Sequence, residues 1–153
     1  LIQNRVETGE PYIMFGDTVQ EALPEFQKEK GLTVHHSNLC SEITLPTDKD
    51  RSAVCCLSSV NLEEYDAWST EPLFIPDLVE MLDNVLTHFI ENAPPHLARA
   101  VYSATQERSI GLGAMGFHAY LQRRNIPFEG PHQEHVPRIV QIVIQGRCHQ
   151  LSY

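Results

Sequence analysis

The sequence has few of the features that assign a protein to a class at once, and each absence excludes something. It carries 11 Lys and Arg against 20 Asp and Glu in 153 residues, a formal net charge of −9. Proteins that hold nucleic acid neutralise its phosphates with clustered Lys and Arg, so we expect no nucleic-acid polymer as a partner. No stretch reaches the roughly 20 apolar residues of a membrane-spanning helix, so we expect no membrane partner either.

Cysteine is also sparse. Four cysteines in 153 residues are too few for a disulfide-stapled secreted module, so we expect a reducing, cytoplasmic location. Ten Pro and eight Gly are close to ordinary usage, which excludes collagen-like and low-complexity chains. Apolar residues make up 42% of the chain, enough for a core in one domain or in part of a larger one. Since the first residue is Leu1 and not Met, we expect a fragment or a processed product.

Hydrophobic spacing, glycines and prolines predict a mixture of helices and short strands. The clearest helix begins at Pro76 or Asp77 and runs to Ile90, because its apolar residues follow i, i+3, i+4, i+7 spacing. Pro94–Pro95 ends that helix, and Pro24 breaks an earlier one. We expect further helices over residues 1–8 (ended by Gly9), 17–30, 96–105 and 114–124, strands over 11–15 and 53–57, a loop over 34–42, a polar connection over 61–69, a glycine-rich connector over 109–113, and an apolar strand or short helix over 139–144.

One short segment combines three chemically useful side chains. Asn38, Cys40 and Glu42 alternate along the chain, so on an extended backbone they share one face. Together they offer a redox-capable sulfur, a hydrogen-bonding amide and an acid or base. The alternative is a small buried cysteine beside two solvated polar groups, and the spacing alone favours it.

A second pair of thiols lies in an apolar run. Cys55 and Cys56 are neighbours, and neighbouring side chains of a strand point to opposite faces, so one thiol is able to face a site while the other packs. A disulfide between the two is geometrically unfavourable. Two core cysteines are the simpler interpretation of the spacing.

The histidines do not form a recognisable metal site. A zinc site needs four ligands at characteristic spacing, whereas His35, His36, His132 and His135 are scattered and no C-x2-C pair accompanies them. We therefore expect no metal to be bound by this chain.

The string G-x-G-x-x-G occurs once, at Gly111, Gly113 and Gly116. A dinucleotide-binding fingerprint needs a hydrophobic strand before it and an acidic residue about 20 positions later. Gln106-Glu107-Arg108 precedes the glycines and is not such a strand. A close-packed entry into a helix is the better interpretation.

Four segments, taken together, resemble a known family. RVETGEPYIMF, SNLCSEITLPT, AVCCLSSVNL and RSIGLGAMGFHAYL occur in this order, and over about residues 1–129 the chain resembles the large, catalytic subunit of ribonucleoside-diphosphate reductase. Asn-Leu-Cys-Ser-Glu-Ile resembles the aerobic, two-subunit class I, whereas the cobalamin-dependent class more often shows Asn-Pro-Cys-Gly-Glu. The resemblance implies an α/β fold, with this chain forming part of a ten-stranded α/β barrel whose centre holds the loop of Cys40.

The resemblance also implies roles for individual residues. Cys40 would become a transient thiyl radical and take the 3′ hydrogen of the ribose, while Glu42 removes the 3′-hydroxyl proton. Asn38 and Ser37 would bind the substrate together with Glu42. Cys55 would be half of the thiol pair that supplies two electrons as the 2′-hydroxyl leaves as water. A shift of one residue would exchange Cys55 with Cys56, but the match of the flanking residues favours Cys55.

The implied activity is reduction of ribonucleoside diphosphates to 2′-deoxyribonucleoside diphosphates, which supplies DNA precursors. The resemblance implies a metal-containing small subunit that generates the radical, thioredoxin or glutaredoxin as the external reductant, and no cofactor bound by this chain. Family members are several times longer, so complementary parts of the large subunit are expected partners. We expect a cytoplasmic protein of a bacterium or a phage-infected cell.

The end of the chain departs from the resemblance. Residues 130–153 match nothing we expect in the family, so we predict a barrel fragment over 1–129 and an unassigned tail over 130–153. Cys148 is single, and its surroundings do not match the family's C-terminal cysteine pair. We expect the isolated chain to be inactive and to expose strand edges that favour self-association.

Two other functions compete with the catalytic one. The amphipathic helix that ends at Ile90 and the acidic charge would also suit a non-catalytic helical interaction module. The eight histidines would suit a metal-binding domain, which elemental analysis tests.

Overall fold

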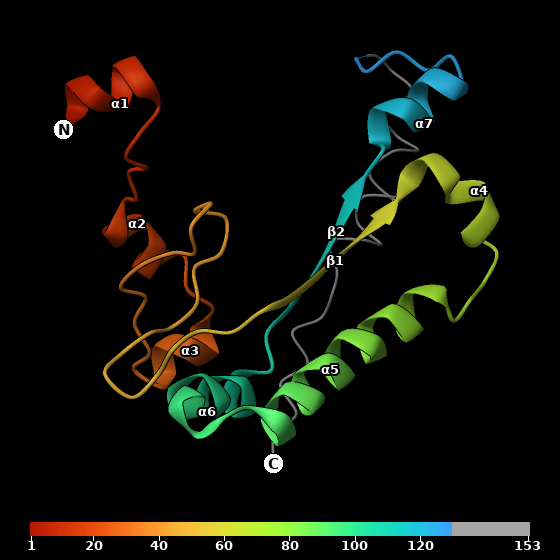
Figure 1. Ribbon diagram of the computed structural model, residues 1–153. Helices are drawn as coiled ribbons and strands as arrows, with labels where there is room; N and C mark the ends of the chain where they lie inside the picture. The colour runs from red at the N-terminus through yellow and green to blue at the C-terminus, as the bar shows by residue number, and fades with distance from the viewer. Residues whose placement is uncertain (130–153) are drawn as a thin grey trace.

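The computed structural model describes residues 1–129, a pair of strands with helices near both of its ends and the first helix standing apart (Figure 1). The elements in chain order are α1 (Ile2–Thr8), α2 (Gly16–Glu21), α3 (Glu25–Glu29), β1 (Cys56–Asn61), the 3₁₀ turn η1 (Leu62–Glu64), α4 (Tyr65–Trp68), α5 (Phe74–Asn92), the 3₁₀ turn η2 (Pro95–Leu97), α6 (Ala98–Glu107), β2 (Ile110–Met115) and α7 (Phe117–Arg123). None of the helices in this part of the chain combines the length and the apolar character needed to cross a bilayer.

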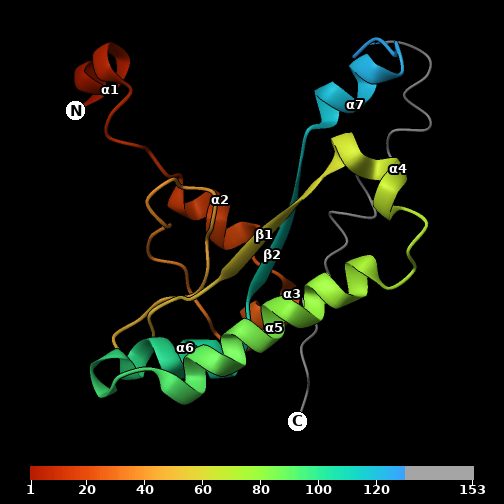
Figure 2. The same ribbon diagram turned by 45° about the vertical axis from the view of Figure 1, so that its right-hand side comes forward.

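The two strands are parallel neighbours. Cys56 pairs with Ile110 at one end of the ladder, and Asn61 pairs with Met115 at the other. Parallel strands need a long crossover connection, and here the crossover contains α4, α5 and α6. Figures 1 and 2 show α4 and α7 together beyond the carboxyl ends of the strands, while α6 lies near their amino ends. This is a β-α-β unit, the building block of an α/β fold.

The hydrophobic core lies where β1 ends and α7 begins. Val60, Leu62, Tyr120 and Leu121 are buried there. Trp68 adds an aromatic layer, because its ring stacks on Phe74 at 5.0 Å between centroids. The partly buried side chains that complete this layer are Tyr65, Ile75, Leu78, Leu112, Phe117 and Ile126. The core thus fixes the carboxyl ends of both strands.

The strand pair has one covered face and one open face. Along β1 the side chains alternate, so Leu57 and Ser59 are exposed while Val60 is buried. Opposite the two exposed residues, β2 places Gly111 and Gly113. A Cβ atom on Gly111 would lie 2.6 Å from Leu57 Cδ2, and one on Gly113 would lie 3.2 Å from Ser59 Oγ. Glycine therefore allows β2 to lie beneath these β1 side chains.

Several predicted elements are confirmed. The i, i+3, i+4 pattern forms α5, which buries Leu82 and Leu86 and ends before the two prolines. The helix expected over 96–105 is α6, and the one broken at Pro24 is the pair α2 and α3. Gly9 ends α1 with φ of 81°, the left-handed conformation that glycine adopts without a steric penalty.

Other predictions are wrong. Residues 11–15 form no strand but an irregular segment before α2, and residues 110–113 of the expected connector belong to β2. The strand expected over 53–57 begins at Cys56, because its ladder starts only where β2 is available. The polar connection over 61–69 contains η1 and α4, and the helix expected from Ala114 begins at Phe117, because β2 continues to Met115. The segment 139–144 lies outside the described residues.

Candidate active site

A tight loop places the side chains of Asn38 and Glu42 against each other. Asn38 Nδ2 donates a hydrogen bond of 2.7 Å to Glu42 Oε1. Two backbone bonds close the loop: Ser41 N–H donates to Asn38 O at 3.1 Å, and Asn38 N–H donates to Ile43 O at 3.2 Å. Asn38 Oδ1 also accepts a hydrogen bond of 3.0 Å from the Ile43 N–H. The asparagine therefore holds both the backbone of the loop and its carboxylate.

The loop brings these groups together by a turn, not by the extended backbone that we expected. Ser41 has φ of 66°, a left-handed conformation that reverses the chain direction. Ser37 Oγ donates a hydrogen bond of 2.9 Å to Asn38 O and lies 3.4 Å from Ser41 Oγ. A reverse turn satisfies these polar groups locally, whereas an extended segment would need a neighbouring strand. The segment is a loop as predicted, but alternation is not the reason for its geometry.

The Cys40 thiol lies at the tip of this loop and lines a cleft. Cys40 is exposed, and the cleft beside it has a volume of about 640 Å³, within the usual range for sites that bind small molecules. Asn38 lines the same cleft, and Tyr12 and Met14 line it from the irregular segment before α2. The other lining residues are Glu10, His35, His36, Ser37, Leu39 and Ser41.

A second cleft, of about 450 Å³, contains Cys55. Ser37 and Asn38 line this cleft as well as the first, so the two clefts share a wall. His36 belongs to the same wall. Leu57 lines the second cleft, two residues beyond Cys55 and on the open face of β1. The residues before β1 thus bring Cys55 to the back of the loop that carries Cys40.

Cys56 occupies different surroundings. It begins β1 and is partly buried, and it does not line either of the two clefts. Burial raises the pKa of the Cys56 thiol above its ordinary value, because a desolvated thiolate is less stable than in water. A raised pKa makes a thiol less reactive at neutral pH, so burial lowers the reactivity of the Cys56 thiol relative to a solvated cysteine.

The remaining motifs have structural roles in the part of the chain that is described. No group of three or more His, Cys, Asp or Glu side chains suited to a metal ion occurs within residues 1–129, and His132 and His135 lie outside that range. Gly111 and Gly113 are strand residues, and Gly116 caps the start of α7 with φ of 74°. The expected close-packed entry into a helix is found at Gly116, but a strand precedes it where the sequence predicted a connector.

Some of the residues that shape the site have little or no signal in the sequence. Tyr12 and Met14 were expected on a strand, yet both line the Cys40 cleft from an irregular segment. Their signal was the i, i+2 spacing of two large side chains just before a glycine. Thr47 and Ser52, which line the Cys55 cleft, carry no signal of their own in the sequence.

Comparison with known proteins gives one consistent result. The family model described as the ribonucleotide reductase barrel domain matches residues 1–153. The ribonucleoside-diphosphate reductase large subunit of Invertebrate iridescent virus 3 is 55% identical over 129 residues, which cover 84% of this chain and 20% of the viral protein. The putative large subunit of Frog virus 3 (isolate Goorha) is 53% identical over 149 residues, which cover 95% of this chain and 26% of that protein.

A solved structure agrees with these relatives. The alpha subunit of the class Id ribonucleotide reductase of Actinobacillus ureae matches with a TM-score of 0.82 and 41% identity, over 95% of this chain and 28% of that chain. The chain thus spans 20% to 28% of the length of these proteins. Its described residues form part of an α/β barrel that they do not close. The chain belongs to the ribonucleotide reductase barrel-domain family.

Proposed function

We propose that this chain is the part of a ribonucleoside-diphosphate reductase large subunit that carries the radical cysteine, and that the whole subunit converts ribonucleoside diphosphates to 2′-deoxyribonucleoside diphosphates. One observation carries the proposal: Asn38 binds Glu42 directly and shares a cleft with Cys40 and another with Cys55. A thiol, a carboxylate and a second thiol around one asparagine are the groups that this reaction needs.

The first step assigned to this site is reversible hydrogen transfer. The Cys40 thiyl radical takes the hydrogen atom from the ribose 3′ carbon, which leaves a thiol on the protein and a carbon radical on the sugar. Glu42 accepts the 3′-hydroxyl proton, and Asn38 keeps its carboxylate oriented through the 2.7 Å hydrogen bond. Ser37 lines both clefts and is assigned to substrate binding with Asn38 and Glu42.

The second step is a two-electron reduction by a thiol pair. Cys55 is one member, and the other lies in a part of the large subunit outside this chain. As the 2′-hydroxyl leaves as water, the two thiols become a disulfide and their electrons pass to the sugar. Cys40 then returns the hydrogen atom to the 3′ carbon and is again a radical. The disulfide must be reduced externally, for which thioredoxin or glutaredoxin is the proposed reductant.

The chain also needs protein partners for this chemistry. A metal-containing small subunit is proposed to generate the radical, because a thiyl radical needs an oxidant that these residues do not supply. The rest of the large subunit is the other partner, since the chain spans only 20% and 26% of two viral relatives. A cytoplasmic location is proposed because the thiols must stay reducible. The division between residues 1–129 and 130–153 also stays a proposal, and the family match includes both parts.

Reconstitution with complementary fragments tests the function. The chain is mixed with the remaining parts of a large subunit and with the small subunit, and formation of deoxyribonucleotide is measured. We expect no turnover from the chain alone, turnover from the mixture, and none when the mixture contains Cys40→Ser. Turnover that survives Cys40→Ser would refute the proposed function.

A matched pair of variants separates the two neighbouring cysteines. Cys55→Ser is expected to abolish turnover in the same mixture, because it removes half of the reducing thiol pair. Cys56→Ser is expected to retain turnover, because it leaves the Cys55 thiol, the proposed half of the reducing pair, in place. The reverse pattern would move the redox role to Cys56. A non-catalytic helical module is not favoured, because it explains neither the cleft arrangement nor the family match.

A further inference from the structure

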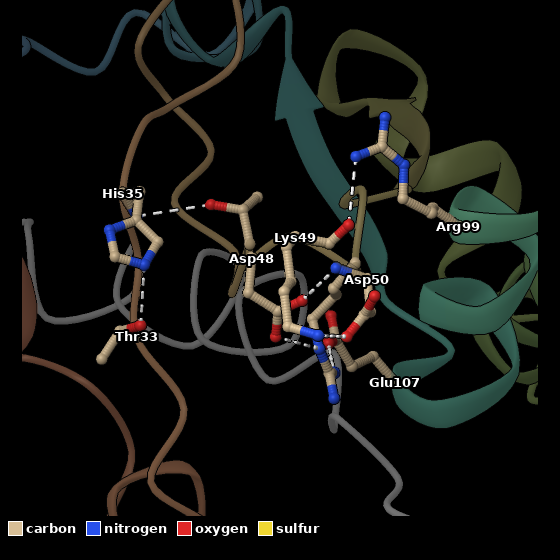
Figure 3. Close-up of polar contacts among 9 residues, drawn as sticks. Thr33, His35, Asp48, Lys49, Asp50, Arg99 and Glu107 are labelled. Atoms are coloured by element: carbon tan, nitrogen blue, oxygen red, sulfur yellow. Dashed lines mark hydrogen bonds and ion pairs between the residues drawn. The ribbon is translucent and has the colours of Figure 1, made fainter.

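A buried ion pair fastens the turn at residues 48–51 to α6. Arg51 Nη1 contacts Glu107 Oε1, and the two side chains are only 10% and 9% exposed. The Arg51 guanidinium also lies 5.3 Å from the ring centroid of Tyr102. Within the turn itself, Asp48 Oδ2 lies 3.7 Å from Arg51 Nε. Figure 3 shows Glu107 beside the turn that carries Asp48, Lys49 and Asp50.

Backbone bonds extend this attachment toward Cys55. Arg99 Nη1 donates a hydrogen bond of 3.1 Å to Lys49 O, as Figure 3 shows. Ser52 N–H donates to Arg99 O at 3.3 Å, and Cys56 N–H donates to Ser109 O at 3.2 Å. The chain on both sides of Cys55 is therefore tied to α6 or to the residues that directly follow it.

In the other direction the turn is joined to the loop of Cys40. Thr47 N–H donates a hydrogen bond of 3.1 Å to Thr33 O, and His35 N–H donates one of 3.4 Å to Thr47 Oγ1. The His35 ring lies 3.0 Å from Thr33 Oγ1 (Figure 3). His35 comes two residues before the loop that begins at Ser37. The turn is thus the covalent and hydrogen-bonded link between the two thiol-bearing segments.

The ion pair is poorly explained by stability alone. Arg51 Nε and Glu107 Oε2 are buried without a hydrogen-bond partner, and such atoms carry a desolvation cost. Burial raises the pKa of Glu107, although Arg51 acts in the opposite direction. Buried ion pairs are often no more stabilising than apolar replacements, but in some proteins they specify one arrangement of the chain. The pair fits a role in fixing geometry.

We propose that Arg51 and Glu107 are positioning residues for the reductase reaction, because they fix the turn that sets the separation between the thiols of Cys40 and Cys55. The proposal rests on the proposed function for its catalytic meaning, but its geometric content is independent of it. Both side chains are nearly buried against each other and lie outside the two clefts, so the proposed role acts through the backbone of the turn.

Pulsed electron paramagnetic resonance measures this separation directly. The full chain carries Cys56→Ser and Cys148→Ser, and spin labels are attached to Cys40 and Cys55. We expect one narrow distance distribution in this parent and a distribution at least twofold broader after Glu107→Gln. The double variant Arg51→Glu/Glu107→Arg, which restores opposite charges, is expected to narrow the distribution again. The matched control is Arg123→Gln, which removes exposed ion pairs to Glu63 and Glu64 and is expected to leave the width unchanged.

Several outcomes overturn the proposal. If Glu107→Gln keeps its helical circular dichroism and its distance distribution is as narrow as the parent's, the ion pair does not position the thiols. If Glu107→Gln loses its helical circular dichroism, Glu107→Asp is the second test. Aspartate keeps the negative charge, but its side chain is one methylene shorter and so lies farther from Arg51. A distance distribution in Glu107→Asp as narrow as the parent's then refutes the positioning role, and a broader distribution supports it.

Turnover links the geometry to the reaction. In the reconstituted mixture we expect Glu107→Gln, without labels, to lower kcat at least tenfold with little change in KM, because substrate binding groups are untouched. A broader distribution with unchanged kcat would refute the catalytic meaning. Failure of the proposed function gives a different result, namely turnover that survives Cys40→Ser while the distance distributions still respond to Glu107→Gln.

Discussion

Replacing Gly116 by alanine tests how the strand pair is joined to the core. Gly116 has φ of 74° between β2 and α7, and a Cβ atom there would clash with Asn61 Oδ1 and lie 3.1 Å from Glu63 N. Asn61 Oδ1 accepts a hydrogen bond of 3.1 Å from the Glu63 N–H, which caps η1. The added methyl group therefore strains its own backbone and displaces a cap.

The expected cost follows from these two effects. A left-handed conformation costs a non-glycine residue about 1–2 kcal/mol, and loss of a cap costs about 1 kcal/mol. Gly116→Ala should therefore lower the free energy of unfolding by about 2–3 kcal/mol. With a slope of about 2 kcal/mol per molar urea, the midpoint should fall by about 1–1.5 M.

Gly111→Ala is the matched control. Its Cβ atom would lie 2.6 Å from Leu57 Cδ2, but this atom is the tip of a side chain that is 56% exposed and is able to rotate away. Alanine also removes the backbone entropy cost of glycine in a strand, so we expect a change within about 1 kcal/mol. Urea denaturation followed through Trp68 fluorescence, the single tryptophan of the chain, measures both variants. Equal losses of stability in the two variants would refute the reasoning.

Two further predictions concern titratable groups. At pH 8 we expect iodoacetamide to modify the exposed Cys40 several-fold faster than Cys56, whose pKa burial raises, and peptide mapping that finds equal rates would contradict this. Burial likewise raises the pKa of Glu107 above its ordinary value of 4.5, so the folded state binds this proton at a higher pH than the unfolded state does. The free energy of unfolding should therefore rise as the pH falls through the folded pKa toward 4.5, relative to Glu107→Gln, in urea titrations at several pH values; a fall of the parent relative to the variant would contradict it.

Local patterns predicted the elements whose cause is local. The apolar spacing that ends at Ile90 predicted α5, because one stripe of a helix must be buried. Gly9 and Pro24 predicted ends and breaks through their own backbone restrictions. The glycines at 111 and 113 were misread as a connector, because their reason is Leu57 and Ser59 on a strand more than 50 positions earlier. A glycine selected by a distant neighbour has the same local appearance as one selected by a turn.

The candidate site divides in the same way. Asn38 and Glu42 are four residues apart, so a turn within the segment is enough to join them, and the residues themselves indicated that grouping although not its geometry. The ion pair of Arg51 and Glu107 spans 56 positions, and no local rule selects those two among 31 charged residues. The two residues meet only because the crossover between β1 and β2 places α6 against the turn at residues 48–51.

The positions of the Cys40 and Cys55 thiols depend on different kinds of contact, local for Cys40 and long-range for the residues around Cys55. The Cys40 loop is closed by hydrogen bonds within residues 37–43. Its shape therefore depends mainly on contacts inside that segment. The residues on both sides of Cys55 are instead fastened to Arg99 and Ser109, which follow only after the long crossover. Forming contacts between segments so far apart in sequence carries a loop-closure cost that local turns do not carry. The separation of the two thiols is consequently a property of the folded β-α-β unit, and disturbing α6 should change it while leaving the contact between Asn38 and Glu42 intact.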